Sequence, residues 1–132
     1  MGELNKLTIS EARDRLRSKE ISSVELTNSC LAEIDMADPL GAFVHKTPEL
    51  ALAQAENADE RLSQGSAPDM CGIPLGIKDL FCTKGVESQA ASRILEGFKP
   101  EYESTVSQNL LDNGTVMLGN LNMDECAMGS SN

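Results

Sequence analysis

The sequence is poor in aromatic and basic residues, and these shortages limit what the chain can do. It has no Trp, one Tyr and three Phe, so its core must consist mainly of Leu, Ile, Val, Ala and Met. Eleven basic residues against twenty-one acidic ones give a formal net charge of −10. Proteins bind nucleic-acid backbones through Lys and Arg side chains that displace counterions. We therefore do not expect this chain to contact nucleic acid directly.

Metal-binding patterns are also missing from the sequence. The four cysteines, Cys30, Cys71, Cys82 and Cys126, lie far apart and form no CxxC pair. Structural zinc sites need closely spaced pairs of ligands, and the single histidine, His45, has no cysteine beside it. We expect buried free thiols, as is usual in a reducing cytosol, and a structural role for His45.

Long apolar runs and leader patterns do not occur in these residues. No stretch approaches the roughly 20 apolar residues of a membrane span, and the N-terminal stretch MGELNKLTISEARDRL is too acidic for a transit peptide. Myristoylation after Gly2 requires Ser or Thr at position 6, which is Lys6. Gly72, Gly76 and Gly85 lack the spacing of a phosphate-binding loop. We expect a cytoplasmic protein.

The first half of the chain carries strong helix signals. Thr8 with Glu11 and Ser22 with Glu25 form two capping boxes, which satisfy free amides at helix starts. Pro48 stands where the first residue of a third helix is expected. The expected elements are a helix from residue 9, a helix from 23 to about 36, a short strand at 41–44 and a helix from 48 to Gly65. The residues expected to face inward are Ile9, Ala12, Leu16, Val24, Leu31, Ile34, Ala51, Ala55, Ala58 and Leu62.

From residue 71 the pattern changes to strands and loops. Residues 71–81 form an apolar run broken by Gly and Pro, which predicts a strand that feeds a turn. Residues 103–112 predict a helix with Val106 and Leu110 inward, and 115–119 a buried strand. We predict an α/β fold with helices covering a mixed sheet, incomplete in these residues. Residues 1–132 would be one part of a single domain, helical over 1–65 and sheet-forming over 71–132, with an unpaired sheet edge.

Lys78 is the candidate catalytic residue, because PLGIKD places one amine at the end of an apolar strand. Burial disfavours the charged form of an amine. A neutral lysine can accept a proton from a hydroxyl, so Lys78 is a candidate general base. The alternative is an ordinary lysine that reaches solvent or pairs with Asp79.

The stretches GIPLGIKDLFCTKGV, at 72–86, and ILEGFKPEYESTVSQNLLDNGTVMLGNLNMDECAMGSSN, at 94–132, resemble the amidase-signature family. Its members use a Ser–cis-Ser–Lys triad, with the lysine in a G-[IV]-K-D context. The resemblance implies that Lys78 is the catalytic lysine. It would relay protons through a cis-peptide serine to the serine that attacks the amide carbonyl.

Within that family, residues 91–98, 102–106 and 122–132 are similar to the A subunits of tRNA-dependent amidotransferases. Such a subunit hydrolyses glutamine and passes ammonia to a B subunit, which amidates mischarged Glu-tRNA(Gln) or Asp-tRNA(Asn). A small C subunit braces the heterotrimer. ATP and magnesium belong to the B subunit, so the resemblance implies no cofactor in this chain. Cys126 departs from the family, which usually has an aromatic residue there.

The resemblance also suggests that Met128, Gly129 and Ser130 line the glutamine pocket; the alternative is a loop that merely turns the chain. Ser130 and Ser131 belong to this MGSS loop and not to the triad. The serine-bearing stretches of the family, Gly-Gly-Ser-Ser-Gly-Gly and Asp-Thr-Gly-Gly-Ser, do not occur in the sequence. We therefore expect no amidase activity from these 132 residues alone.

Three weaker interpretations stay open from the sequence. Asp124 and Glu125 are neighbours whose side chains point apart, which favours a solvated helix start over acid–base work. The chain is alternatively part of another amidase of the same family that acts on a different small amide. A third interpretation is a non-catalytic remnant or interaction protein, which would keep the helices as a scaffold.

Overall fold

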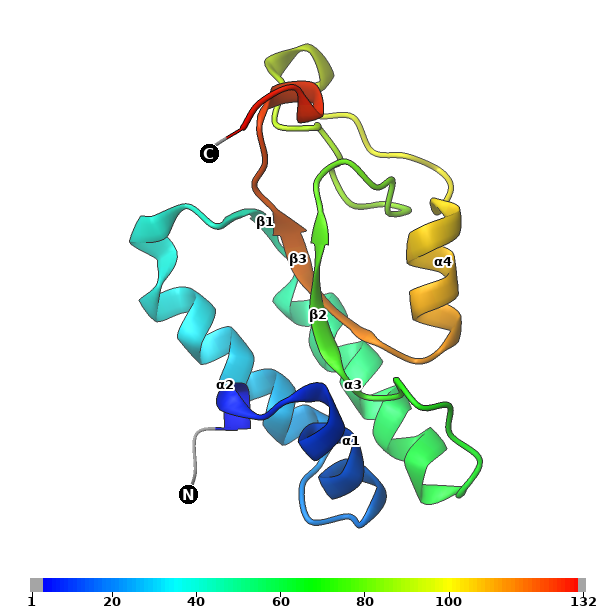
Figure 1. Ribbon diagram of the computed structural model, residues 1–132. Coiled ribbons are helices and arrows are strands. Elements are labelled where there is room, and N and C mark those ends of the chain that lie inside the picture. Colours follow the sequence, from blue (N-terminus) through cyan, green and yellow to red (C-terminus); the bar gives the residue numbers. More distant parts are fainter. Residues whose placement is uncertain (1–3, 131–132) are drawn as a thin grey trace.

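The computed structural model describes residues 4–130, which form a small sheet with helices packed on it (Figure 1). The helices are α1 (Ile9–Arg17), α2 (Ser23–Met36), α3 (Pro48–Ser63) and α4 (Thr105–Asp112). The strands are β1 (Phe43–Lys46), β2 (Pro74–Lys78) and β3 (Val116–Leu121). Four short 3-10 turns complete the order, η1 (Leu4–Lys6), η2 (Asp38–Leu40), η3 (Arg93–Leu95) and η4 (Glu125–Ala127).

The sheet has three strands in the order β1-β3-β2, and it is mixed. The central strand β3 runs parallel to β2 and antiparallel to β1. This confirms the α/β fold with a mixed sheet that the sequence predicts. The C-terminal ends of β2 and β3 lie at the same edge of the sheet, where the loop after β2 and the end of the described chain gather at the top of Figure 1.

The helices α2 and α3 build the main core with the central strand. α3 packs against β3, and α2 packs against α3 and also contacts β2 and β3. Ala51 and Ala55 of α3 are fully buried against Val116 and Leu118 of β3. Their small side chains let the helix approach the sheet closely. The stripe of alanines predicted from the sequence is thus the face that meets the sheet.

A second core cluster lies under the N-terminal helices. Ala12 and Leu16 of α1 pack with Leu26 of α2 and with Ile73, just before β2. The partly buried residues that flank this cluster are Leu4, Leu7, Ile21, Cys30, Leu62 and Met70. The cluster therefore ties the start of the chain to the strand that carries Lys78.

Gly119 lies where β3 is irregular against both of its neighbours. The register of β2 with β3 shifts between Leu75 and Gly76, and that of β1 with β3 shifts between Phe43 and His45. Gly119 has a φ of +152°, and a Cβ atom there would overlap the carbonyl oxygen of His45. Bulges need a residue that accepts unusual dihedrals and close backbone approach. Glycine is therefore required at this position.

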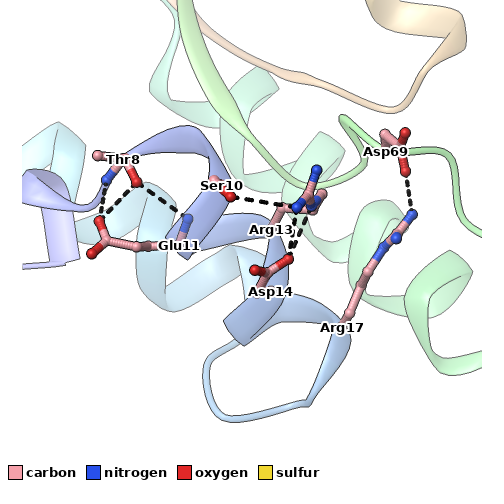
Figure 2. Close-up of polar contacts among 7 residues, drawn as sticks. All are labelled: Thr8, Ser10, Glu11, Arg13, Asp14, Arg17 and Asp69. Carbon is pink, nitrogen blue, oxygen red and sulfur yellow. Dashed lines mark hydrogen bonds and ion pairs between the residues drawn. The ribbon is translucent and has the colours of Figure 1, made fainter.

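Both predicted capping boxes are present. Thr8 accepts a hydrogen bond from the backbone N–H of Glu11, and the Glu11 carboxylate accepts from the backbone N–H of Thr8 at 2.9 Å (Figure 2). Ser22 and Glu25 repeat the arrangement at α2. Figure 2 also shows the far end of α1, where Arg17 pairs with Asp69 at 2.6 Å.

Replacing Thr8 with Ala in the protein removes the cap of α1 and should lower its melting temperature at neutral pH. The Glu11 carboxylate accepts hydrogen bonds from the backbone N–H and from the hydroxyl of Thr8. Both bonds lower the pKa of Glu11 from its ordinary value of 4.5, and the backbone bond has the larger effect. The ionised carboxylate is thus the stabilising form, and its contribution is present above pH 4.5 and lost as the pH falls through the lowered value. Melting curves should show a smaller difference between wild type and variant at pH 3 than at pH 7. An equal difference at both pH values would contradict this account.

Two predicted inward-facing residues are exposed. Ile9 is 58% exposed, because it is the first residue of α1 and projects beyond the contact that Ala12 and Leu16 make. Val106 is 47% exposed; α4 instead buries Ser107, whose hydroxyl donates to the backbone carbonyl of Cys82 at 2.9 Å. A polar contact with the loop after β2 thus replaces the expected apolar one.

The expectation of buried free thiols holds only in part. All four cysteines are free, but only Cys71 is buried, and Cys126 is exposed. Burial raises the pKa of the Cys71 thiol. In residues 4–130, no helix is long and apolar enough to cross a membrane.

Candidate active site

Lys78 is the last residue of β2, the strand whose C-terminal end lies at the sheet edge where the loops gather (Figure 1). The side chain is exposed, and within residues 4–130 its ammonium has no hydrogen-bond or ion-pair partner. The expected dry surroundings are therefore not formed by these residues. In the described part of the chain β2 is one of the two outer strands of the sheet, and β3 is its only strand neighbour, so no further strand covers this side.

Asp79 follows Lys78 directly in the sequence, where it is a candidate ion-pair partner of that lysine. It is 1% exposed, and its carboxylate accepts three hydrogen bonds. The donors are the backbone N–H of Gln89 at 3.2 Å, the backbone N–H of Ala91 at 3.0 Å and the side-chain amide of Asn120 at 3.1 Å. The ion pair between Lys78 and Asp79, one of the two ordinary interpretations of the lysine, is therefore not formed. The other one, exposure to solvent, describes Lys78 in these residues.

A polar network extends from Asp79 across the sheet. Asn120 of β3 is fully buried and also donates to the backbone carbonyl of Glu87 at 2.7 Å. The Glu87 carboxylate lies 3.4 Å from Nδ1 of His45 on β1. The side-chain amide nitrogen of Gln89 lies 3.2 Å from Nε2 of His45. All three strands are thus tied to the loop that follows β2.

These contacts define the role of His45. The amide nitrogen of Gln89 can only donate, so Nε2 of the ring accepts and Nδ1 carries the proton toward Glu87. Both ring nitrogens are engaged in holding the loop against β1. The structural role expected for His45 is what these contacts support.

Two pairs of residues at this edge have left-handed backbone dihedrals. Ala90 and Ala91 have φ values of +51° and +52°, and Cys126 and Ala127 have φ values of +53° and +59°. Such conformations cost roughly 1–2 kcal/mol for each residue that carries a Cβ. The two pairs are in contact, because the N–H of Cys126 donates to the carbonyl of Ala90 at 2.9 Å. Strain of this kind persists only where surrounding contacts hold it, and it is frequent at functional sites.

A further hydrogen bond joins the same two segments. The hydroxyl of Ser92, which is 1% exposed, donates to the Glu125 carboxylate at 2.7 Å. Asp124 is the residue before η4 and makes no side-chain cap there. Glu125 therefore contacts the loop after β2, whereas Asp124 stands at the start of η4. The two carboxylates do not form a joint acid–base pair.

Met128, Gly129 and Ser130 follow η4 and are exposed, Met128 at 84%. They lie beyond the C-terminal end of β3, at the same edge of the sheet as Lys78 (Figure 1). A Cβ atom at Gly129 would overlap the side chain of Asp124, so the turn needs glycine there. Ser131 lies outside the described residues.

Asp79 and Asn120 organise this edge, and neither was predicted from the sequence to do so. The signal for Asn120 was present, since it is an amide inside an otherwise apolar strand and therefore needs buried partners. In the described part of the chain, no group of three or more His, Cys, Asp or Glu side chains is arranged to hold a metal ion.

Comparison with known proteins identifies the family. The family model described as Amidase matches residues 25–132. The A subunit of glutamyl-tRNA(Gln) amidotransferase from Jannaschia sp. (strain CCS1) is 70% identical over the whole chain, which covers 27% of that protein. Its counterpart from Ruegeria pomeroyi is 71% identical over 133 residues, with 100% of this chain and 27% of that protein covered. The chain thus spans about a quarter of the length of these relatives and corresponds to their N-terminal quarter.

Solved structures agree with the sequence relatives. The peptide amidase from Stenotrophomonas maltophilia superimposes with a TM-score of 0.84 at 29% identity, over 91% of this chain and 25% of that one. A protein of a vestigial complex related to an s-triazine catabolic enzyme gives a TM-score of 0.86 at 33% identity, over 90% and 27% of the two chains. The family model covers most of the sequence, and the chain belongs to the amidase family.

Proposed function

We propose that this chain is the N-terminal part of a glutamine-hydrolysing A subunit of a tRNA-dependent amidotransferase, to which it supplies Lys78 as the catalytic lysine. The observation that carries the proposal is the 70% identity, over the whole chain, to subunits of that name. The position of Lys78 supports it, because the residue ends β2 at the end of the sheet where the loops gather.

The chemistry assigned to Lys78 is proton transfer. As a neutral amine it accepts, through the cis-peptide serine, the proton of the nucleophilic serine. The serine oxygen then attacks the amide carbon of glutamine, the C–N bond breaks, and the returned proton leaves with ammonia. Water hydrolyses the resulting ester, which releases glutamate and the free serine. Both serines belong to the part of the protein beyond these residues.

The partners follow from the same assignment. Ammonia passes to a B subunit, which uses ATP and magnesium to amidate the mischarged tRNA, and a C subunit braces the complex. No cofactor is assigned to this chain. The net charge of −10 supports a subunit that leaves RNA contacts to its partner, because an acidic surface repels phosphates.

A second candidate is an amidase for a different small amide. Its support is the fold shared with the peptide amidase from Stenotrophomonas maltophilia. The identity to that enzyme is 29%, against 70% to the amidotransferase subunits, which favours glutamine as substrate. An ammonia assay of the full-length protein with glutamine, asparagine and propionamide decides between them. Release from propionamide with none from glutamine would reject the amidotransferase proposal.

The 132 residues alone should release no ammonia from glutamine, because they contain neither triad serine motif. The same assay on the full-length protein should give glutamate and ammonia in equal amounts. Activity from the 132 residues alone would show that the nucleophile has been assigned wrongly.

The coding sequence past codon 132 offers a simple check: an immediate stop codon would favour a non-catalytic remnant, and continuation into a Ser-Ser-Gly-Gly motif would favour the enzyme.

A further inference from the structure

We propose that Asp79 is a positioning residue, whose buried carboxylate fixes the Lys78 backbone and the loop after it in the geometry that proton transfer needs. The inference rests on the proposed function, since it assumes that Lys78 is the catalytic amine. It concerns a side chain that itself reaches no substrate, because Asp79 is 1% exposed and turned into the protein.

Asp79 is held at its backbone and at its side chain. Its N–H donates to the carbonyl of Leu121 at 3.0 Å, which continues the pairing of β2 with β3 by one residue. Its own carbonyl accepts from the N–H of Ala90 at 3.0 Å. With the three bonds to the carboxylate, five hydrogen bonds fix the residue next to Lys78. The Lys78 backbone therefore has little freedom at a place where a strand would otherwise fray.

The carboxylate also stabilises the strained turn. Its bonds to the N–H groups of Gln89 and Ala91 bracket Ala90, and both alanines have positive φ. Alanine in this conformation is strained, and the buried carboxylate helps to hold it together with the backbone hydrogen bonds of Ala90. The same turn contacts Cys126, two residues before Met128. One carboxylate thus links the lysine to the segment just before Met128, where the family resemblance suggests that the substrate pocket begins.

An anion suits this position better than a neutral amide does. The three groups that face the Asp79 oxygens are all N–H donors, and a carboxylate only accepts. An asparagine would place its NH₂ group against one of these donors.

The test is Asp79→Asn in the full-length protein, assembled with its partner subunits, with glutamine kinetics measured well below the melting temperature. We expect kcat to fall about 10²-fold, as small misplacement of a catalytic group can cost that much, while the KM for glutamine changes little. The matched control is Asp59→Asn. Asp59 also accepts two backbone N–H bonds, from Ser23 at 2.7 Å and Val24 at 3.2 Å, but at the start of α2. The control variant should lose stability and keep kcat.

The outcomes separate positioning from plain stability. Wild-type kcat in Asp79→Asn, or a rise in KM alone, overturns the proposal, and so does an equal loss of kcat in the Asp59 control. If Asp79→Asn does not fold, Asn120→Ser takes its place; it removes one of the three donors and should lower kcat less, whereas unchanged kcat overturns the proposal.

Lys78→Met is measured beside them. Full activity in that variant would reject the proposed function itself, whereas its inactivity beside an active Asp79→Asn rejects only the positioning role.

Discussion

Replacing Lys78 with Met in the full-length protein should reduce glutamine hydrolysis by about 10²–10⁴-fold, the usual contribution of a general acid–base group. Methionine keeps the length and the apolar stem of lysine but cannot accept a proton. The KM for glutamine should change little, because the proposed role of the amine is in the chemical step. The measurement is ammonia release at saturating glutamine.

Lys84 provides the matched control for that variant. It is an exposed lysine on the loop after β2, and it is tied to the protein through its backbone N–H, which donates to Glu103 at 3.0 Å. Lys84→Met removes one positive charge from the same region without touching the strand end. It should keep wild-type turnover. An equal loss in both variants would attribute the effect to charge and not to the Lys78 amine.

Replacing Gly119 with Ala should destabilise the protein by roughly 2–6 kcal/mol, since backbone strain and overpacking each contribute about 1–3 kcal/mol. The new methyl group would overlap the His45 carbonyl and approach the Lys46 Cα and the Phe43 ring, both at 3.1 Å. Relief requires β1 to separate from β3. Melting temperature and the yield of soluble protein report the effect.

A second variant, Gly65→Ala, distinguishes backbone strain from overpacking as causes of the lost stability. Gly65 has a φ of +78° after the end of α3, and a Cβ there would meet nothing within 4 Å. Gly65→Ala therefore introduces backbone strain without a clash and should cost roughly 1–2 kcal/mol. A loss in Gly119→Ala no greater than that in Gly65→Ala would contradict the close approach of β1 to β3.

The sequence predicted those parts of the fold that depend on local signals. The two capping boxes, Pro48 at the start of α3 and the alanine stripe are each encoded by residues within one helix, and the structure confirms them. The strand predicted at 41–44 occurs at Phe43–Lys46. It lies in the half of the chain predicted to be helical, and it completes the sheet by pairing with β3.

The rest depends on contacts between distant residues, which spacing does not reveal. Asp79 looked like a partner for Lys78, but its carboxylate is bound by groups ten to forty-one residues away. Val106 is apolar and at helical spacing, yet the hydroxyl of Ser107 makes the buried contact. The dry surroundings expected for Lys78 are likewise not formed by its own strand and loop.

The most direct test of the central claim is the rate of the first turnover. Mixed rapidly with glutamine, the full-length wild-type protein should release ammonia as its serine is acylated, and Lys78→Met should slow this first release by about the same 10²–10⁴-fold as steady-state turnover. A first turnover of undiminished rate in Lys78→Met would show that the serine loses its proton without this amine, and would contradict the account.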